Sequence, residues 1–492
     1  MKNPFHSGRL GAGPCHRAAL LAVMVLPMLP AASRAEELRV FHSAEGKPLK
    51  ASFESMAGDK VTLRREDGKS FELPKAKLSA EDQAYLAEVG QRAGDAAKKL
   101  NSAAGHEITD GTSISKSKAA DLAEALQLRP ESQSKYGRSW RLYAAYAKDY
   151  LLFGAMPYSV ALYSDQAGTV SSVSIVYANK GDFGSTAGLG QDHFNGGTSS
   201  TAKTLGEAMT KDEETVSKSL TAVLGEGKVQ RYGEGATRRK ITRWDWNGSA
   251  FILSNEENEY VSLAIVASAT ADNGGKSVMV KDGDVKQRLL ASVVKADNGD
   301  VSLSEIPMVD QGPKGYCAPA TFERAMRTMG LEADMYLLAM VGQSQAGGGT
   351  SVELLLEGVR SQVYSKGRRT KDETLKELRI RDLKRYLDEG IPVMWTLCSM
   401  EAYNETANKN TETRKTVKDW KAYATEIAAK GAELAKTAKP EANHHICMII
   451  GYNEATQEIA VSDSWGPRFE RRWVPVSVAN WANMGGIFMI LP

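Results

Sequence analysis

The chain has 492 residues, of which 42% are hydrophobic and 25% are charged, so it is long enough for about three domains. Its formal net charge of +2 gives no electrostatic argument for binding nucleic acid or a membrane surface, and we expect no nucleic-acid partner. The four cysteines are too few and too scattered for a disulfide framework, which excludes the class of small disulfide-stabilised secreted domains.

Residues 1–35 are typical of a secretory signal peptide. Four basic residues and no acidic ones accompany the apolar run 18–29, and Ser33-Arg34-Ala35 is a small-residue cleavage site. The run is too short to span a bilayer, so we expect cleavage, no stable membrane insertion, and a secreted or periplasmic protein. An uncleaved membrane anchor is the alternative. Cleavage would lower the net charge from +2 to −2 and would also remove Cys15.

Residues 36–90 form a small β module in our interpretation. Short alternating runs separated by turns with glycine predict strands at 37–41, 49–56, 60–65 and 70–73. Ser79 is placed to cap a following helix, with Asp82 at its third position. A series of short strands followed by Leu-Ser-Ala-Glu-Asp-Gln at 78–83 resembles the Sla1 homology domain 1, which has an SH3-like fold. The resemblance implies a peptide or protein partner, and a passive structural role is the alternative.

Residues 91–130 read as a linker with helical pieces, and residues 131–275 as a separate α+β domain of unknown role. The loop 181–201 is rich in Gly, Ser and Thr and contains His193 near Asp182 and Asp192. These three residues could suggest a metal site, but their spacing is not diagnostic and a solvated loop explains them. No phosphate-binding motif follows the glycines. We therefore expect neither a metal nor a cofactor.

Residues 276–492 contain the stretch that carries chemistry, Asp310–Ala320, which reads DQGPKGYCAPA. Apolar residues at helical spacing follow Cys317, and Gly330 is placed to end the helix. Cys317 therefore lies at a helix N-terminus, where the dipole and the free N–H groups lower the pKa of a thiol. A cysteine in this position is a candidate nucleophile that needs a base.

His445 begins an apolar run that ends in Gly451-Tyr452 and predicts a buried strand. A second strand, 458–462, leads directly into Asp463. If the turn 453–457 joins the two strands as a hairpin, His445 and Asp463 become neighbours, which suits a carboxylate that orients an imidazole. His444 is the rival of His445, and strand alternation allows only one of them to face the cysteine.

These residues resemble the papain-like cysteine peptidases. Gln311 precedes Cys317 by six positions, as in that group, and the motif Asp463-Ser464-Trp465-Gly466 stands where papain has Asn-Ser-Trp-Gly. The sequence Tyr-Cys-Ala-Pro-Ala departs from papain and is more similar to the C39-type branch, in which Asp is the usual third residue. The resemblance covers roughly residues 300–492. It implies a papain-like peptidase fold for the C-terminal part. With the SH3-like β module and the central α+β domain interpreted above, the chain is expected to be a multidomain α+β protein.

The resemblance also implies the roles of the site residues. Cys317 would attack a carbonyl carbon, His445 would move the proton, and Asp463 would fix the His445 tautomer. The Gln311 side chain would bind the oxyanion, together with the backbone N–H of Cys317. The loop with Gly348 and Gly349 would border the substrate cleft, where an extended peptide could pair with its backbone. Trp465 would shield the His–Asp hydrogen bond or contact the substrate.

Each of these residues also has a structural interpretation, since a lone cysteine is commonly a small buried hydrophobe. Together they favour an exported cysteine peptidase that acts on peptides or proteins. A thiol acyltransferase or amidase would use the same residues, because an amine can resolve the thioester in place of water. A non-catalytic binding scaffold is the third possibility. Residues 399–442 read as a surface insertion near His445, which is a lid, a partner site or simply a solvated helix.

Overall fold

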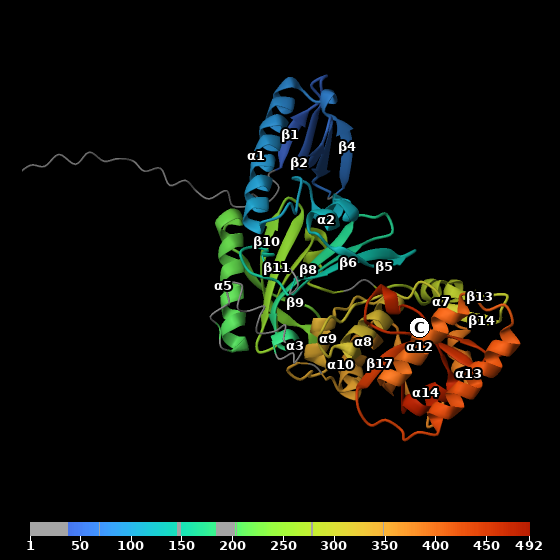
Figure 1. Cartoon of the computed structure of the whole chain (residues 1–492). Helices are drawn as coiled ribbons and strands as arrows, with labels where there is room; N and C mark the ends of the chain where they lie inside the picture. Colours follow the sequence, from blue (N-terminus) through green and yellow to red (C-terminus); the bar gives the residue numbers. More distant parts are fainter. Residues whose placement is uncertain are drawn as a thin grey trace, which may run out of the picture.

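The structure is a computed structural model that describes residues 38–67, 69–144, 149–183, 202, 204–276, 279–347 and 349–492. The expected signal peptide lies outside these ranges, as do Gly348 and His193. Three units follow one another along the chain (Figure 1): an N-terminal unit of residues 38–104, a central unit of residues 105–276 and a C-terminal unit of residues 279–492.

The N-terminal unit is a four-stranded antiparallel sheet with a long helix beside it (Figure 1). Its strands pair in chain order: β1 (Arg39–His42), β2 (Pro48–Ala57), β3 (Lys60–Arg65) and β4 (Ser70–Pro74). Alternate side chains of β3, Val61 and Leu63, are fully buried against Phe41 and Leu86. This alternation is the reason that such a short polar sequence can bury one face of a sheet.

The helix α1 (Ala80–Ala104) begins as the sequence predicts and continues past the boundary predicted at residue 90. Ser79 accepts a hydrogen bond from the Asp82 backbone N–H at 3.2 Å, which satisfies a free donor of the first turn. Gly90 lies within the helix, where a Cβ would be 2.4 Å from the Met56 side chain, so the glycine allows a close approach to β2. The helix ends instead at Gly105, whose φ of +76° is left-handed.

The central unit is an eight-stranded antiparallel sheet in the order β5-β6-β7-β8-β12-β11-β10-β9. The strands are β5 (Arg129–Ser134), β6 (Gly137–Tyr143), β7 (Ser159–Ser164), β8 (Val170–Asn179), β9 (Lys228–Tyr232), β10 (Arg239–Trp246), β11 (Ser249–Glu256) and β12 (Tyr260–Ala267). The helix α5 (Leu205–Leu224) covers one face (Figure 1). The stretch 91–130, where we expect a linker, contributes buried side chains to the same core, among them Leu100, Ile114, Leu122 and Leu126.

The C-terminal unit is built around a sheet with the path β13-β14-β17-β16-β20-β15, with β18 pairing with β17 and β19 with β18. Its strands are β13 (Val293–Lys295), β14 (Asp300–Leu303), β15 (Arg369–Thr374), β16 (Val393–Cys398), β17 (His444–Asn453), β18 (Glu458–Ser462), β19 (Arg472–Pro475) and β20 (Asn483–Leu491). Its helices are α7 (Asp282–Ser292), α8 (Cys317–Thr328), α9 (Met335–Val341), α10 (Val352–Ser365), α11 (Ile380–Leu387), α12 (Glu401–Arg414), α13 (Trp420–Ala435) and α14 (Val476–Ala482). Helices are therefore interspersed with strands along this unit, which has a mixed α/β architecture.

The predicted hairpin is confirmed, because β17 and β18 pair antiparallel with Met448 opposite Ser462 and Asn453 opposite Glu458. The start of β17 therefore lies beside the end of β18. The two other cysteines of this unit, Cys398 and Cys447, are free and buried. Within the described ranges, no helix has both the length and the hydropathy to cross a bilayer.

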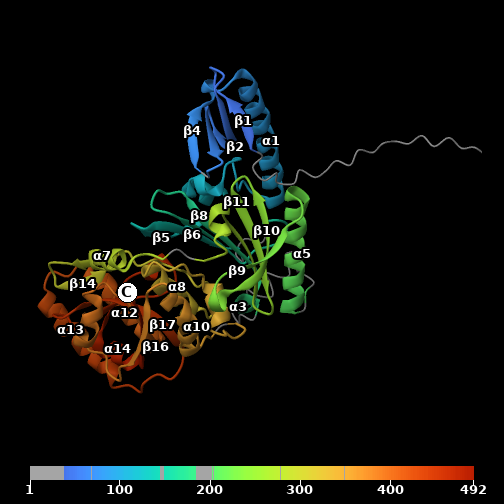
Figure 2. The ribbon, with the colours of Figure 1, turned by 180° about the vertical axis from the view of Figure 1, so that it is seen from behind.

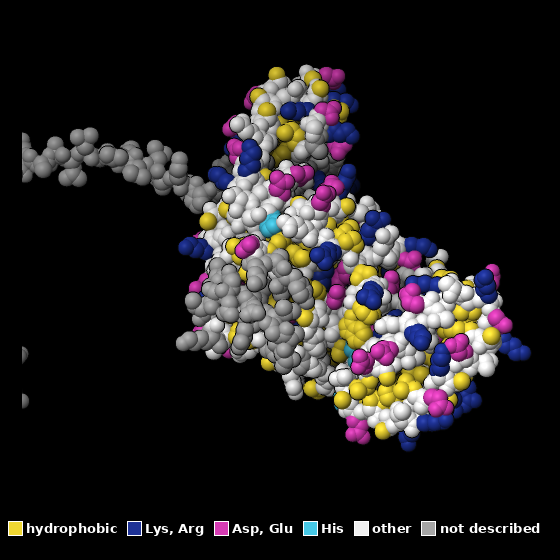
Figure 3. Space-filling model, in the orientation of Figure 1, with side chains coloured by type: hydrophobic (Ala, Val, Ile, Leu, Met, Phe, Trp, Pro, Cys, Tyr) yellow, Lys and Arg dark blue, Asp and Glu magenta, His cyan; other side chains and the backbone are white. Residues whose placement is uncertain are grey.

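The central and C-terminal units lie against each other in both views (Figures 1 and 2). Val176 and Tyr260 of the central sheet share a buried cluster with Val309, Tyr316 and Tyr336 of the C-terminal unit. On the face seen in Figure 3, side chains of both charges are interspersed over the N-terminal and C-terminal units. That mixture is what a net charge close to zero leads one to expect.

Candidate active site

Side chains on one face of α8 fix the position of the candidate nucleophile relative to the β17–β18 hairpin. Cys317 is the first residue of α8, and Thr321 and Arg324 follow it at i+4 and i+7, which is one helical face. The Thr321 hydroxyl donates to the Ile446 carbonyl of β17 at 3.2 Å, and Arg324 donates to the Ser462 carbonyl of β18 at 3.2 Å. Both side chains are fully buried. The helix is thus held against the two strands that carry His445 and Asp463.

Cys317 and His445 share a hydrogen bond, and Cys317 is half-buried. Burial alone would raise the pKa of the Cys317 thiol. The hydrogen bond with His445 and those from the Ile446 and Ala318 backbone N–H groups outweigh burial and hold that pKa below its ordinary value. No side chain caps the first turn of α8, so its N–H dipoles also face the sulfur. The arrangement favours a thiolate that solvent can reach.

His445 is held between the thiol and a buried carboxylate. Its Nε2 donates to Asp463 Oδ1 at 3.0 Å, which leaves Nδ1 for the hydrogen bond with Cys317. Burial lowers the pKa of His445, but the hydrogen bonds with Asp463 and Cys317 prevail and raise it to about 9. His444 is exposed on the other face of β17. The alternation of the strand therefore turns His445, and not His444, toward the cysteine.

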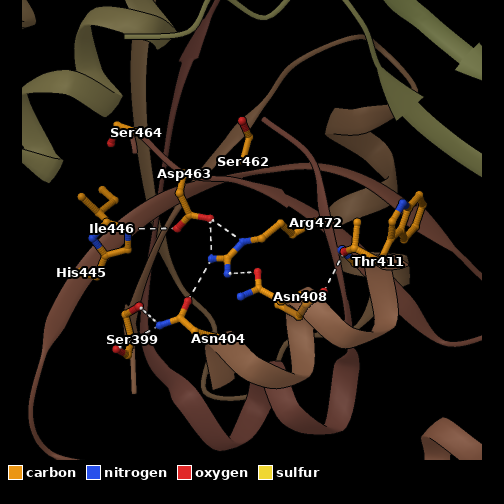
Figure 4. A network of polar contacts seen from close by, with 12 residues as sticks. Ser399, Asn404, Asn408, Thr411, His445, Ile446, Ser462, Asp463, Ser464 and Arg472 are labelled. Carbon is orange, nitrogen blue, oxygen red and sulfur yellow. Dashed lines mark hydrogen bonds and ion pairs between the residues drawn. The ribbon is translucent and has the colours of Figure 1, made fainter. Parts of the chain in front are cut away.

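Asp463 has a second partner that the sequence analysis missed, Arg472 at the start of β19 (Figure 4). Arg472 donates to Asp463 Oδ2 from Nη2 at 2.7 Å and from Nε at 3.2 Å, so each carboxylate oxygen has its own donor. Burial raises the pKa of Asp463, but the hydrogen bond from His445 and the charge of Arg472 outweigh it and keep the pKa below its usual range. With a thiolate at Cys317 and an imidazolium at His445, the four charges sum to zero.

The helix α12 orients Arg472 (Figure 4). Asn404 and Asn408, one turn apart on the helix, accept from Arg472 at 3.0 and 3.1 Å. Asn404 in turn donates to the Ser399 hydroxyl at 3.0 Å. Part of the predicted surface insertion therefore supports the site. The helical spacing of the two asparagines is a signal that could have suggested a shared polar partner.

Trp465 stacks on the His445 ring, with centroids 4.6 Å apart and an angle of 27° between the planes. The Arg472 guanidinium also packs against the indole, with its central carbon 5.4 Å from the Trp465 ring centre. The indole therefore covers the imidazole beside the His445–Asp463 hydrogen bond. A contact between Trp465 and a substrate stays a prediction.

Gln311 is buried beside the site, and its amide group is fixed at both ends. Its Nε2 donates to the Lys314 carbonyl at 2.9 Å, and its Oε1 accepts from the Ser464 hydroxyl at 3.3 Å. Its backbone N–H also donates to the Ser464 carbonyl at 2.8 Å. An amide nitrogen carries two hydrogens, so one N–H remains for an oxyanion.

The glycine loop after α9 lies beside the loop that leads to Cys317. Gly349 donates to the Gly315 carbonyl at 3.1 Å and accepts from the Gln345 N–H at 2.9 Å. Gly347 donates to the Lys180 carbonyl of the central unit at 3.3 Å. Both backbone polar groups of Gly349 are therefore already paired. Pairing of a peptide substrate with this loop stays a prediction.

Among the residues that the structure describes, no three His, Cys, Asp or Glu side chains gather as metal ligands do. Of the residues considered for a metal, Asp182 is the described one, and it is 3.2 Å from the Lys314 ammonium.

Residues 303–488 match the model of the Peptidase_C39 like family. The matched stretch begins in β14, ends in β20 and contains Gln311, Cys317, His445 and Asp463. It supports a C39-like, cysteine-peptidase-like domain at the C-terminus, and we call the C-terminal unit the C39-like domain from here on. A comparison with curated proteins found no match.

Proposed function

We propose that the chain is an exported cysteine peptidase in which Cys317, His445, Asp463 and Gln311 hydrolyse peptide bonds. The observation that carries the proposal is the hydrogen-bonded series from Cys317 through His445 to Asp463, within the residues that match the family model. The hydrogen bond with His445 and the lowered pKa of the Cys317 thiol favour a nucleophile over a structural thiol.

The proposed chemistry follows from the positions of these groups. The Cys317 thiolate attacks the carbonyl carbon of a peptide bond, and the negative charge that forms on oxygen is bound by N–H groups of Gln311 and Cys317. His445 donates its proton to the leaving amine, which leaves a thioester on Cys317. His445 then takes a proton from water, whose oxygen attacks the thioester. The acid is released, and the thiolate and imidazolium form again.

The partner and location of the protein belong to the same proposal. The substrate is a peptide or protein, and the N-terminal unit, with its resemblance to an SH3-like module, binds a protein partner. Residues 1–35 direct export, which places the enzyme outside the cytoplasm. Mass spectrometry of the mature N-terminus tests the export step, because cleavage is expected after Ala35.

Labelling and product analysis test the reaction. Iodoacetamide at neutral pH is expected to modify Cys317 much faster than a model thiol, and a peptide library is expected to yield hydrolysed products. Products that carry an added amine would indicate the acyltransferase alternative. Labelling at the rate of a model thiol, with no product of either kind, would favour a non-catalytic scaffold.

A further inference from the structure

The loop that leads to Cys317 lies between the C39-like domain and the central unit. On the central side, the chain leaves β8 and turns through the short helix α3 (Lys180–Phe183). Lys180 accepts from the Gly347 N–H, and Gly181 donates to the Tyr316 hydroxyl. One segment of the central unit therefore contacts both the glycine loop and the residue that precedes the nucleophile.

A buried ion pair joins the two sides. Lys314 of the nucleophile loop and Asp182 of α3 are 3.2 Å apart, with side-chain exposures of 0% and 2%. The rings of Tyr143, Tyr336 and Tyr316 surround the Lys314 ammonium at 4.7, 4.9 and 5.5 Å. Among the described residues, Asp182 is the charged partner of Lys314 at ion-pair distance, and Lys314 is that of Asp182. A buried charge that loses such a partner is strongly destabilised.

Two glycines allow the close approach. Tyr316 of the nucleophile loop packs on Gly181, where a Cβ would lie 2.4 Å from the ring. Tyr143 of the central unit packs on Gly312, where a Cβ would lie 2.7 Å from the ring. Each side thus offers a glycine to a tyrosine of the other side. The interface fits this one placement of the loop.

The same loop holds the proposed oxyanion donor. The Lys314 carbonyl accepts from the Gln311 amide, so the residue that is paired with Asp182 also fixes Gln311. The Asp310 backbone N–H donates to Glu131 Oε1 at 2.8 Å, and Tyr143 donates to the Asp310 carbonyl. Glu131 itself is buried and paired with Arg141 at 2.5 Å. Residues of the central unit therefore hold the loop on both sides of Gln311.

We propose that Asp182 and Glu131 are positioning residues for the Gln311 oxyanion donor, and that the central unit is a working part of the active site. This inference rests on the proposed function. The contacts of the central unit described above include those with Asp310, Lys314 and Tyr316, and none of the contacts described is with the Cys317 side chain. Support of the loop explains such contacts better than inhibition does.

The variant Asp182→Asn tests the proposal in the full chain, because Asn keeps the size of Asp and removes its charge. We expect kcat for the best peptide from the library to fall about 10-fold or more, since a displaced oxyanion donor acts in the transition state. Alkylation of Cys317 by iodoacetamide needs no oxyanion donor, so its rate and pH profile are expected to stay within about 2-fold.

Two further variants serve as controls. Glu259→Gln breaks the partly exposed ion pair of Glu259 with Lys180, at 2.8 Å, which does not involve the nucleophile loop. It is expected to leave kcat within about 2-fold. The double variant Asp182→Asn with Lys314→Met removes both buried charges, and it is expected to recover most of the kcat lost in Asp182→Asn.

Hydrogen–deuterium exchange tests the loop without any substrate. In Asp182→Asn, exchange is expected to rise at residues 308–317 and to stay unchanged at 444–463. A wild-type chain that hydrolyses no peptide would refute the proposed function, while this measurement would still decide the placement of the loop. Unchanged exchange at 308–317 would overturn the inference. So would a higher kcat, which would mark the contact as inhibitory, or a matching loss of alkylation, which would mean general damage to the site.

Discussion

The two halves of the candidate site are supported in different ways. His445 and Asp463 are held inside the C39-like domain, by Arg472 from β19 and by Asn404 and Asn408 from α12. The loop with Gln311 is held from outside that domain, by Glu131 and Asp182. We therefore expect the proposed proton transfer and the proposed oxyanion binding to be separable, so that each can be damaged by a substitution that leaves the other intact.

The largest effect is expected from Cys317→Ala, because both halves of the proposed site act on a substrate bound to this sulfur. Without the sulfur no thioester forms, and we expect peptide hydrolysis to fall by at least about 10⁴-fold. Alanine suits the start of α8, so circular dichroism should show an unchanged fold. Cys398→Ala is the control, since the Cys398 thiol is buried and donates to the Pro440 carbonyl at 3.2 Å. Iodoacetamide labelling that persists in Cys317→Ala would place the reactive thiol elsewhere.

Asp463→Asn is expected to damage the proton-transfer half alone. Asp463 raises the pKa of His445, which is about 9, so the neutral amide lowers it. His445 then loses the proton for the leaving amine at a lower pH, and the alkaline fall of kcat/KM moves below pH 9. We expect kcat/KM at neutral pH to drop roughly 10²- to 10³-fold.

A pH profile of kcat/KM for both forms measures this shift. Asp165→Asn, which changes an exposed carboxylate in a turn of the central unit, is the control and should leave the profile in place. An alkaline limb that stays near pH 9 in Asp463→Asn would mean that Asp463 does not set the charge of His445.

Arg472→Met separates the support of Asp463 from its direct contact with His445. Loss of the guanidinium removes the donors that the described residues give to Asp463 Oδ2, including a charge-assisted hydrogen bond. We therefore expect kcat/KM to fall about 10-fold. Arg468→Met is the matched control, because Arg468 is an exposed arginine in the segment between β18 and β19. Equal losses in the two variants would show that Arg472 acts only through general charge. Exchange at 308–317 should not change in either variant, in contrast to Asp182→Asn.

The features that the sequence predicts are those written in local patterns. The Cys317 helix follows from apolar spacing and from Gly330, and the hairpin follows from two apolar runs joined by a turn. Short apolar runs are ambiguous, and the run at 289–295 is divided between α7 and β13. The helix α7 has eleven residues and buries only one side. Over so few positions, the spacing of its apolar residues cannot be told from that of a strand.

The supporting residues could not be predicted because their partners are far away in the sequence. Arg472 meets Asn404 and Asn408 only when β19 packs on α12. Lys314 meets Asp182 only when two units dock, and a lysine and an aspartate taken singly are typical of any solvated loop. Periodicity reports which face of an element is buried, but it does not report which element covers that face.

Trp465→Ala is expected to have the smallest effect, and it decides between two roles for the indole. If Trp465 shields the His445–Asp463 hydrogen bond, kcat falls about 5-fold with an unchanged KM, in line with the ~1 kcal/mol of an aromatic pair. If it contacts the substrate, KM rises while kcat holds. Phe469→Leu is the control, because Phe469 packs edge-on against Trp465, with ring centres 5.4 Å apart, and its effect should be smaller than that of Trp465→Ala. A kcat loss would place Trp465 with the proton-transfer half of the site, and a KM change would place it in the cleft.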